Sequence, residues 1–434
     1  MHITSIFKKL LNVKEIVITN IRLERQGKEE VLVIAAKPTK KERGRCSVCG
    51  RKSPGYDAGT KARRWRSTDV GLIRVYIEYD LPRVCCAEHG VVAARVPWAR
   101  HDAWFTKSYE DTVTWLALHS TRSMVAELMR TSWQTVGAIT KRVYDDIKKA
   151  SPDLLDGLER IGIDETSYKK GHKYMMVIVN HDTGALVWAA PKYGKAALDE
   201  FFQELGKERC ARIHIVTADG ARWISDSVEA HCPSVERCID PFHVVSWATD
   251  ALDEIRKIVW NDARKQAGPA GALKKPGRPK AGEERRGDAA KEIKGSRYAL
   301  LKNPENLTAS QEATVEMIAK SNPMLYRAYL LKEKLRLVFR YPPEDAEAEL
   351  DAWIKWAMHS RIPQFVELQR KIKRHKDAIL ASIRHGVSNA RIEAVNNKIK
   401  VAIRMGYGFR NLENMIALIM LRCSKLDVAL PGRA

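Results

Sequence analysis

Hydrophobic positions repeat with two different periods along the chain, and each change of period marks an expected element. Alternation over IVITNIRLE and VLVIAA, after a short basic helix, predicts strands within residues 1–37. A longer alternating stretch predicts one strand from Val70 to Val84. From 104 to 150 the spacing becomes helical, and Ser132 offers an N-cap after a tight turn. These helices predict a helix-turn-helix.

Residues 158–260 mix both periods and predict an α/β unit. Three strands come first, over LERIGIDET, KYMMVIVNHD and GALVWAA. A helix, the strand RIHIVTAD, a second helix, the strand VERCID and a long helix follow. Three antiparallel strands and then alternating helices and strands are the order of an RNase H-like fold.

The remaining C-terminal part is expected to be mainly helical. Residues 264–297 are an exception, because they are rich in Gly, Pro, Lys and Arg. This segment holds eleven basic and four acidic residues, a balance of +7, and predicts a mobile loop. Residues 305–385 return to helical spacing, and residues 388–426 predict two helices around the break RMGYGFRN.

The charge of the chain narrows the class of partner. With 75 basic and 53 acidic residues among 434, the net charge is +22, which favours a polyanionic partner. The charge is spread along the chain, so nucleic acid is favoured over an acidic membrane surface. No run of 18 apolar residues and no secretory h-region is found, so we expect a cytosolic protein and no membrane partner.

Four residues of the N-terminal part have the spacing of zinc ligands. Cys46 and Cys49 form a CxxC pair, and Cys86 with His89 forms a CxxH pair. Thirty-six residues separate the pairs, which suits a zinc ribbon with long strands and a structural Zn²⁺. Cys85 is a rival for the third ligand position, and free buried thiols are the alternative to a metal site.

Two aspartates follow apolar strands of the α/β unit. We expect Asp164 at the end of the first strand and Asp219 just after the fourth. If these strands are neighbours, the two carboxylates and a third from a helix can hold two magnesium ions, because hard cations prefer oxygen ligands. The alternative is that Asp164 is a turn residue and Asp219 caps the helix at Trp223.

A third carboxylate comes from the predicted helix at SNARIEAVNNKIK. Glu393, Asn397 and Lys400 share one face of it, at spacings of four and three residues. A carboxylate beside an amide and a lysine suits a site for metal and phosphate. A solvated helix face is the alternative.

Two segments are candidates for contact with DNA. A linker, KKPGRPK, resembles an AT-hook centred on Arg278, although a plain basic linker explains it equally well. The helix that starts at Ser132 would read bases and hold phosphates, unless the three helices are only a packing module. Its candidate side chains are Gln134, Thr135, Lys141 and Arg142.

Several sequence blocks, in the right order over nearly the whole chain, carry a resemblance to a known family. They include CSVCG, CCAEHG, VPWAR, IGIDETSYKKGHKYMMVIVNHDTGALVW, HIVTADGARW, CIDPFHVVSWATDALDEIRK, LLKNPENLT and SNARIEAVNNKIKVAIRMGYGFRNLENMIAL. The chain resembles the DDE transposases of bacterial insertion sequences, specifically the ISL-three family. The chain departs from the family pattern at one point. The stretch that begins at Asp219 reads Asp-Gly-Ala-Arg-Trp, where the family often has Asp-Met before a Trp.

The resemblance assigns roles to residues of this sequence. It implies that Asp164, Asp219 and Glu393 are catalytic ligands of two Mg²⁺ ions, or of Mn²⁺. It implies that Lys400, seven residues after Glu393, contacts DNA. Another family block, DPFHV, contains Asp240, Phe242 and His243, of which Asp240 could contribute to the pocket and His243 could touch a phosphate. Helix capping by Asp240 and packing of His243 are the alternatives.

The resemblance also implies the activity and the partners. We expect a DNA transposase that binds terminal inverted repeats and catalyses metal-dependent cleavage and strand transfer. Its partners would be the double-stranded DNA of the element ends and the target, with a homodimer or larger assembly on paired ends. A non-catalytic repressor derived from a transposase, or an RNase H-like nuclease or resolvase, is the alternative.

The expected fold class is a multidomain α+β protein, with a zinc ribbon, a helix-turn-helix and an RNase H-like core carrying a long helical insertion. The expected boundaries are 1–100 for the zinc-binding domain, 101–150 for the helix-turn-helix, 155–245 for the first part of the core, 246–385 for the helical insertion, and 386–434 for the C-terminal core helices.

Overall fold

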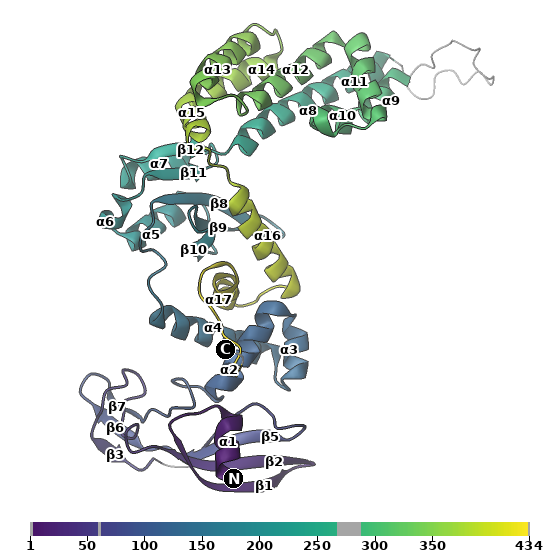
Figure 1. The fold of residues 1–434 in the computed structure, drawn as a ribbon. Coiled ribbons are helices and arrows are strands. Elements are labelled where there is room, and N and C mark those ends of the chain that lie inside the picture. The colour runs from purple at the N-terminus through teal and green to yellow at the C-terminus, as the bar shows by residue number, and fades with distance from the viewer. Residues whose placement is uncertain (1–2, 60–61, 267–287, 433–434) are drawn as a thin grey trace, which may run out of the picture. The chain divides into compact units, whose positions relative to one another are not determined.

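The chain folds into two compact units (Figure 1). This computed structural model describes residues 3–59, 62–266 and 288–432. Unit 1 comprises Met1–Leu154, Tyr168–Lys173 and Asn396–Ala434, and unit 2 comprises Leu155–Ser167 and Tyr174–Val395. None of the helices in the described residues is long and apolar enough to cross a membrane.

Unit 1 begins with helix α1 (Ile3–Leu11) and a four-stranded sheet of order β1-β2-β5-β4. β1 pairs antiparallel with β2, and β2 pairs parallel with β5. Inward-facing apolar side chains form its core, in which Trp65 packs edge-on against Trp98 with ring centroids 5.6 Å apart. The bounds of the strands are Ile16–Gln26 (β1), Glu29–Pro38 (β2), Ala62–Arg66 (β4) and Arg74–Asp80 (β5).

The prediction of one strand from Val70 to Val84 is wrong. β5 ends at Asp80, and β6 (Arg83–Cys86) belongs to a separate three-stranded sheet. Pro82 lies between them and has no amide hydrogen for a strand ladder, so the chain changes sheets there. The second sheet has the order β3-β6-β7, with β3 at Gly55–Asp57 and β7 at Gly90–Ala93.

Three helices follow as the sequence predicted: α2 (Lys107–His119), α3 (Arg122–Leu128) and α4 (Trp133–Ala150). Each begins after a hydroxyl side chain that accepts a hydrogen bond from the first turn, and Ser132 caps α4 as expected. The C-terminal helix α17 (Leu412–Cys423) packs against α2 and α4. Gly137 permits the approach, because a Cβ atom there would lie 2.7 Å from the Asn414 side-chain amide.

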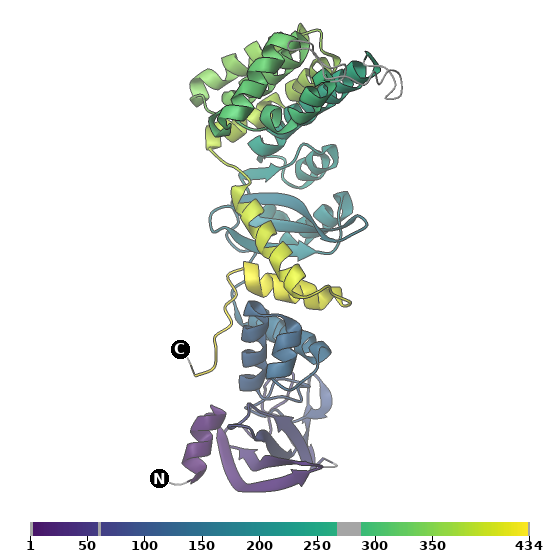
Figure 2. The same ribbon diagram turned by 90° about the vertical axis from the view of Figure 1, so that its right-hand side faces the viewer.

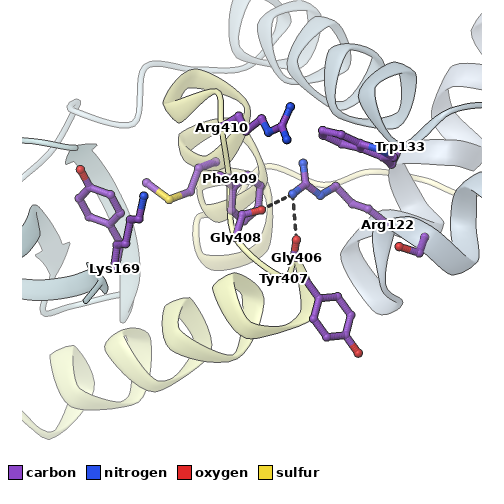
Figure 3. A pocket seen from close by; sticks show the side chains of 11 residues that line it. Arg122, Trp133, Lys169, Gly406, Tyr407, Gly408, Phe409 and Arg410 are labelled. Atoms are coloured by element: carbon purple, nitrogen blue, oxygen red, sulfur yellow. Dashed lines mark hydrogen bonds between the residues drawn. The ribbon is translucent and has the colours of Figure 1, made fainter. Parts of the chain in front are cut away.

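The break RMGYGFRN forms a loop between α16 (Ala390–Met405) and α17, as predicted. Within unit 1, Arg122 of α3 donates hydrogen bonds to two carbonyl oxygens of this loop, those of Gly406 and Gly408 (Figure 3). Gly408 has a φ of +93°, a conformation that favours glycine. The side chain of Asn411 then caps α17.

Unit 2 contains a five-stranded sheet of order β10-β9-β8-β11-β12. β9 and β10 are antiparallel, whereas β11 is parallel to both β8 and β12. The elements match the predicted order, with the short α6 added: β8 (Arg160–Lys169), β9 (Lys173–Asn180), β10 (Ala185–Ala190), α5 (Lys195–Leu205), α6 (Lys207–Cys210), β11 (Ile215–Ala218), α7 (Arg222–His231) and β12 (Glu236–Ile239). Most strand residues are buried, which explains their nearly continuous hydrophobic sequence.

A helical subdomain completes unit 2 (Figure 2). Its core is a continuous apolar cluster around the fully buried Trp353, whose indole donates a 2.8 Å hydrogen bond to Leu331 O. Its helices are α8 (Pro241–Gln266), α9 (Asp288–Gly295), α10 (Arg297–Leu301), α11 (Ala309–Ser321), α12 (Pro323–Val338), α13 (Pro343–Met358), α14 (Pro363–Arg374) and α15 (Lys376–His385).

The predicted loop at 264–297 is partly wrong. α8 continues to Gln266, and α9 covers residues 288–295 because Ala290 and Ile293 share one apolar face. The segment as a whole has low hydrophobicity, so its sequence pattern does not indicate this short helix. The remaining part, with the AT-hook candidate Arg278, lies outside the described residues.

Candidate metal centres and DNA-binding surface

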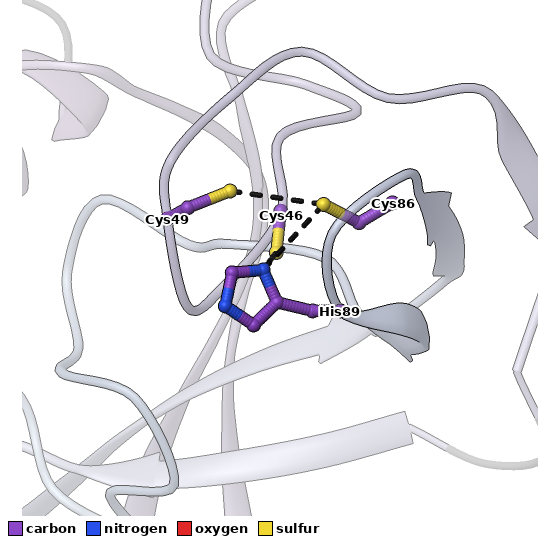
Figure 4. A group of neighbouring side chains, drawn as sticks. All are labelled: Cys46, Cys49, Cys86 and His89. Atoms are coloured by element: carbon purple, nitrogen blue, oxygen red, sulfur yellow. Dashed lines mark hydrogen bonds between the residues drawn. The ribbon is translucent and has the colours of Figure 1, made fainter.

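The four predicted zinc ligands come together in unit 1 (Figure 4). Sγ of Cys49 lies 3.7 Å from Sγ of Cys86, and Nδ1 of His89 lies 3.6 Å from Cys86 Sγ and 3.9 Å from Cys46 Sγ. All four ligand atoms lie within 4.8 Å of one another. Ligands of a tetrahedral zinc ion are separated by roughly 3.4–3.8 Å, so the arrangement fits such an ion.

Local structure explains why Cys86, and not Cys85, joins the cluster. Side chains alternate along β6, which buries Cys86 and leaves Cys85 exposed. The hydrogen bond with His89 lowers the pKa of Cys86 to about 6, which favours the thiolate that a metal binds. The turn at Cys46 is closed by a hydrogen bond from Gly50 N to Cys46 O of 2.9 Å.

The two predicted aspartates belong to neighbouring strands of unit 2, Asp164 within β8 and Asp219 directly after β11. Thr217 of β11 pairs with Gly162 of β8. The pairing ends there, two residues before Asp219 and Asp164, and neighbouring strands are about 4.8 Å apart. Asp164 lies within β8 rather than at its end, because β8 continues beyond its pairing with β11.

A third acid directly follows another strand of the same sheet. Ala218, the last residue of β11, pairs with Ile239, the last residue of β12. Asp219 and Asp240 are the residues that directly follow these two strands. Asp240 is 4% exposed, and its Oδ2 has no hydrogen-bond partner among the described residues. Its Oδ1 accepts a hydrogen bond from Phe242 N at the start of α8, so the expected capping role is present as well.

Helix α16 is fixed to the same sheet through Asn389, the residue before its first turn. The Thr217 hydroxyl donates a 2.7 Å hydrogen bond to Asn389 Oδ1, and Asn389 N donates to Asp240 Oδ1 at 3.3 Å. Glu393 lies one turn further and donates its backbone N–H to Asn389 O. Gly162 leaves room for Ile392, the neighbour of Glu393, because any Cβ at 162 would clash with it.

The three carboxylates do not form a tight cluster. Among the described residues, only the Cys46 group has three or more ligand atoms within 4.8 Å of one another. Oδ1 of Asp219 accepts a 2.9 Å hydrogen bond from Ala221 N, which is the turn role considered for it. The structure therefore does not gather Asp164, Asp219 and Glu393 into one ligand group of that kind, and the Glu393 side chain is exposed.

Basic and aromatic side chains near Asp219 were not identified from the sequence. Arg237 donates a 2.6 Å hydrogen bond to Asp219 O. The indole of Trp247 lies under Lys371 Nζ, 3.6 Å from the ring centroid, and close to Gly220. Burial lowers the pKa of Lys371, and the carboxylate of Asp219 opposes that shift. Three different elements supply these residues, so no sequence motif connects them.

The predicted DNA-reading side chains differ in their partners. Gln134 is exposed near the start of α4, whereas Thr135 hydrogen-bonds the capping Ser132 side chain at 2.8 Å. Lys141 forms an ion pair with Asp145 at 2.6 Å on the same helix. Arg142 pairs with Glu110 of α2, a carboxylate that is fully buried. Arg142 therefore already joins two helices of unit 1.

Three family matches cover most of the chain. Residues 42–89 match the zinc finger of the transposases IS204, IS1001, IS1096 and IS1165, and residues 94–144 match the helix-turn-helix domain of transposase family ISL3. Residues 161–419 match the DDE-type transposase family of ISL3. These segments contain, respectively, the cysteine cluster, helices α2 and α3 with most of α4, and the acids Asp164, Asp219 and Glu393.

Curated relatives agree over nearly the full length. The transposase for insertion sequence element IS1557, from two strains of Mycobacterium tuberculosis, is 48% identical over 436 aligned positions, covering 99% of this chain and 97% of the relative. The transposase for insertion sequence element IS1001 of Bordetella parapertussis is 28% identical and covers 93% of this chain and 92% of its own length. The chain therefore belongs to the ISL3, or ISL-three, family of DDE transposases.

Proposed function

We propose that this protein is the transposase of an insertion sequence, which binds the terminal inverted repeats, cleaves DNA at the element ends and joins them to a target. Family membership supports the activity. The observation that supports the chemistry is the parallel pairing of β8 with β11, because the same register continued for two residues would bring Asp164 and Asp219 together. The hydrogen bond between Thr217 and Asn389, one helical turn before Glu393, supports the assignment of Glu393 as the third acid.

We also propose that the sheet of unit 2 is RNase H-like. Its antiparallel strands β10, β9 and β8, followed by the parallel β11 and β12, support this assignment. The helices α8–α15 then form the insertion between Asp219 and Glu393. The fold explains how acids that are far apart in the sequence can serve one reaction.

The proposed metal ligands of the reaction are Asp164, Asp219 and Glu393. Carboxylate oxygens suit Mg²⁺ or Mn²⁺, and the unpartnered buried Oδ2 of Asp240 adds negative charge at the end of the neighbouring strand β12. Two such ions would stabilise the attacking and leaving oxygens of a phosphodiester displacement. The side chains of the protein would hold the metal ions and align the DNA strand. Phosphoryl transfer by this route needs no covalent protein intermediate.

We propose that the zinc-binding domain and the helix-turn-helix recognise DNA. The Cys46, Cys49, Cys86 and His89 cluster would hold a structural Zn²⁺, which keeps the small three-stranded sheet folded. The exposed Gln134 would read a base edge. Thr135, Lys141, Arg142, Lys400 and Arg278 are the proposed further DNA contacts.

Paired element ends and target DNA would be held by a homodimer or larger assembly. We place the protein in the bacterial cytoplasm with the nucleoid, because its substrate is chromosomal and element DNA. The net charge of +22 is in keeping with such a polyanionic partner.

A strand-transfer assay with pre-cleaved ends tests the joining step. The full chain is incubated with labelled terminal-repeat DNA that ends in a free 3′ hydroxyl, with a target plasmid and Mg²⁺. We expect a joined product. Cleavage of intact ends without any joined product would instead identify a nuclease or resolvase, and binding without either reaction would identify a repressor.

A further inference from the structure

A pocket in unit 1 lies where α3, the start of α4 and the α16–α17 loop meet (Figure 3). Its cavity volume is about 480 Å³, within the range of roughly 300–1,000 Å³ that is typical of small-molecule sites. The end of β8 contributes Tyr168 and Lys169, which belong to the same unit. None of the roles proposed above uses this pocket.

Basic side chains gather in the lining of the pocket. Arg122, Lys169 and Arg410 line it, and no Asp or Glu is among the described residues that do so. The Arg122 guanidinium donates to the carbonyl oxygens of Gly406 and Gly408, while its Nε is buried without a hydrogen-bond partner in the described part of the chain. A lining with three basic side chains favours an anionic ligand.

Aromatic rings accompany the cations. Trp133, the first residue of α4, is 38% exposed. The guanidinium carbons of Arg122 and Arg410 each lie 5.8 Å from the centroid of its ring. Phe409 lies beneath Arg122 at 4.1 Å. Such interleaved guanidinium and aromatic groups are what proteins use to stack unpaired bases and hold their phosphates.

The loop that closes the pocket has an unusual backbone. Tyr407 has a φ of +48°, and its side chain is 84% exposed. A non-glycine residue in this region is strained, and such strain is found preferentially at ligand sites. The two carbonyl hydrogen bonds from Arg122 hold the loop in this shape. The loop therefore presents an aromatic ring and Arg410 at the rim of the pocket.

We propose that this pocket binds one nucleotide of DNA that has left the duplex stack, with its base against Trp133 and its phosphates near Lys169 and Arg410. The proposal rests on the DNA-binding part of the proposed function. The position at the start of α4 supports it, because the N-terminal residues of the second helix of a helix-turn-helix lie closest to the bases. A planar base matches the exposed indole, and a phosphate is attracted to the basic side chains of the lining.

The test compares two DNA probes by fluorescence anisotropy with the full chain, without added divalent metal. One is a blunt duplex, and the other carries a single-stranded tail of about five thymidines, near the smallest site sizes of single-strand binders. We expect the tailed duplex to bind more tightly, by roughly 5- to 150-fold, the effect of stacking one base. Trp133→Ala should remove this preference, and Trp133→Phe should retain most of it.

A matched control is available in unit 2. Trp356 is 37% exposed, close to the value for Trp133, and Trp356→Ala should leave the tail preference unchanged. Arg410→Ala removes an exposed charge and should weaken tail binding without unfolding α4. Circular dichroism checks that each variant is folded. A tail containing 5-iodouracil should photo-crosslink to the peptide that carries Trp133.

Equal affinity for both probes would overturn the proposal, as would a preference that survives both Trp133→Ala and Arg410→Ala. A change in oligomeric state on Trp133→Ala, with tail binding intact, would assign the pocket to a second copy of the chain. Because these measurements need no cleavage, failure of the proposed catalytic activity leaves their outcome unaffected.

Discussion

The Thr217 hydroxyl of β11 donates a 2.7 Å hydrogen bond to the side-chain oxygen of Asn389, 172 residues further along the chain. Both side chains are buried. Thr217 lies two residues before Asp219, and Asn389 lies one helical turn before Glu393. Together with the hydrogen bond from Asn389 N to Asp240 Oδ1, this contact links strand β11 to the start of α16.

Removal of the Thr217 hydroxyl should weaken that coupling. Thr217→Val keeps the volume but leaves the buried Asn389 oxygen unsatisfied, at a cost of about 1–3 kcal/mol in the free energy of unfolding. We expect DNA cleavage to fall while binding to terminal repeats persists, because Glu393 loses its fixed position. Thr217→Ser should restore both. Equal activity of the Val and Ser variants would show that the contact does not position α16.

Neutral replacements of the three acids test the catalytic assignment directly. Asp164→Asn, Asp219→Asn and Glu393→Gln each keep the side-chain shape but remove the charge that a cation requires. We expect cleavage of end-labelled repeat DNA to be lost in all three, with binding in gel-shift assays retained. Glu413→Gln, at an exposed position of α17, is the control. Persistent cleavage in any one variant would remove that residue from the proposed triad.

Some of this arrangement could be predicted from local pattern and some could not. Hydrophobic alternation located the strands around Asp164 and Asp219, because burial of a central strand leaves a long apolar run. Hydrophobic alternation continues across Pro82, so the sequence pattern indicates one strand there. Only the assignment of β5 and β6 to different sheets reveals two strands. The Thr217–Asn389 contact and the pocket at Arg122 depend on tertiary packing between distant segments, for which one sequence carries no signal.

The zinc cluster offers a comparison between neighbouring cysteines. Cys46→Ser should release the bound zinc and destabilise the three-stranded sheet, because structural zinc sites contribute folding free energy. Cys85→Ser should change neither, since Cys85 is exposed and outside the cluster. Elemental analysis of the purified variants measures the metal content. Full zinc content in Cys46→Ser, or loss in Cys85→Ser, would contradict the ligand assignment.

His181 should make unit 2 sensitive to acid. Burial lowers the pKa of His181 to about 4, and its Nε2 lies 2.6 Å from the Thr217 hydroxyl. Because Thr217 donates to Asn389, His181 must donate to Thr217 from Nε2, and burial keeps the imidazole neutral. The unfolded chain takes up this proton near pH 6.5, so the stabilisation is fully present above that pH and is lost as pH falls towards 4.

The expected loss between about pH 7.5 and about pH 5 is about 2 kcal/mol in the free energy of unfolding, from roughly 1.4 kcal/mol per pH unit. Urea denaturation at both values, for wild type and His181→Gln, isolates this contribution. The variant keeps a neutral donor and should show a smaller acid-induced loss. An identical pH dependence in both proteins would mean that His181 is not held neutral in the folded state.

The response of DNA binding to salt should reveal how many phosphates the basic protein contacts. Each neutralised phosphate releases counterions, so six or more contacts would reduce affinity by about 10³-fold or more between low and physiological salt. Anisotropy titrations at several salt concentrations give the slope of log affinity against log salt concentration.

Lys400→Ala should lower the magnitude of that slope by about 1, the loss of one phosphate contact. Lys320→Ala, at an exposed position of α11 with no proposed DNA role, should leave the slope unchanged. A nearly flat salt response of the wild type would contradict a broad electrostatic interface, and an unchanged slope in Lys400→Ala would remove that lysine from it.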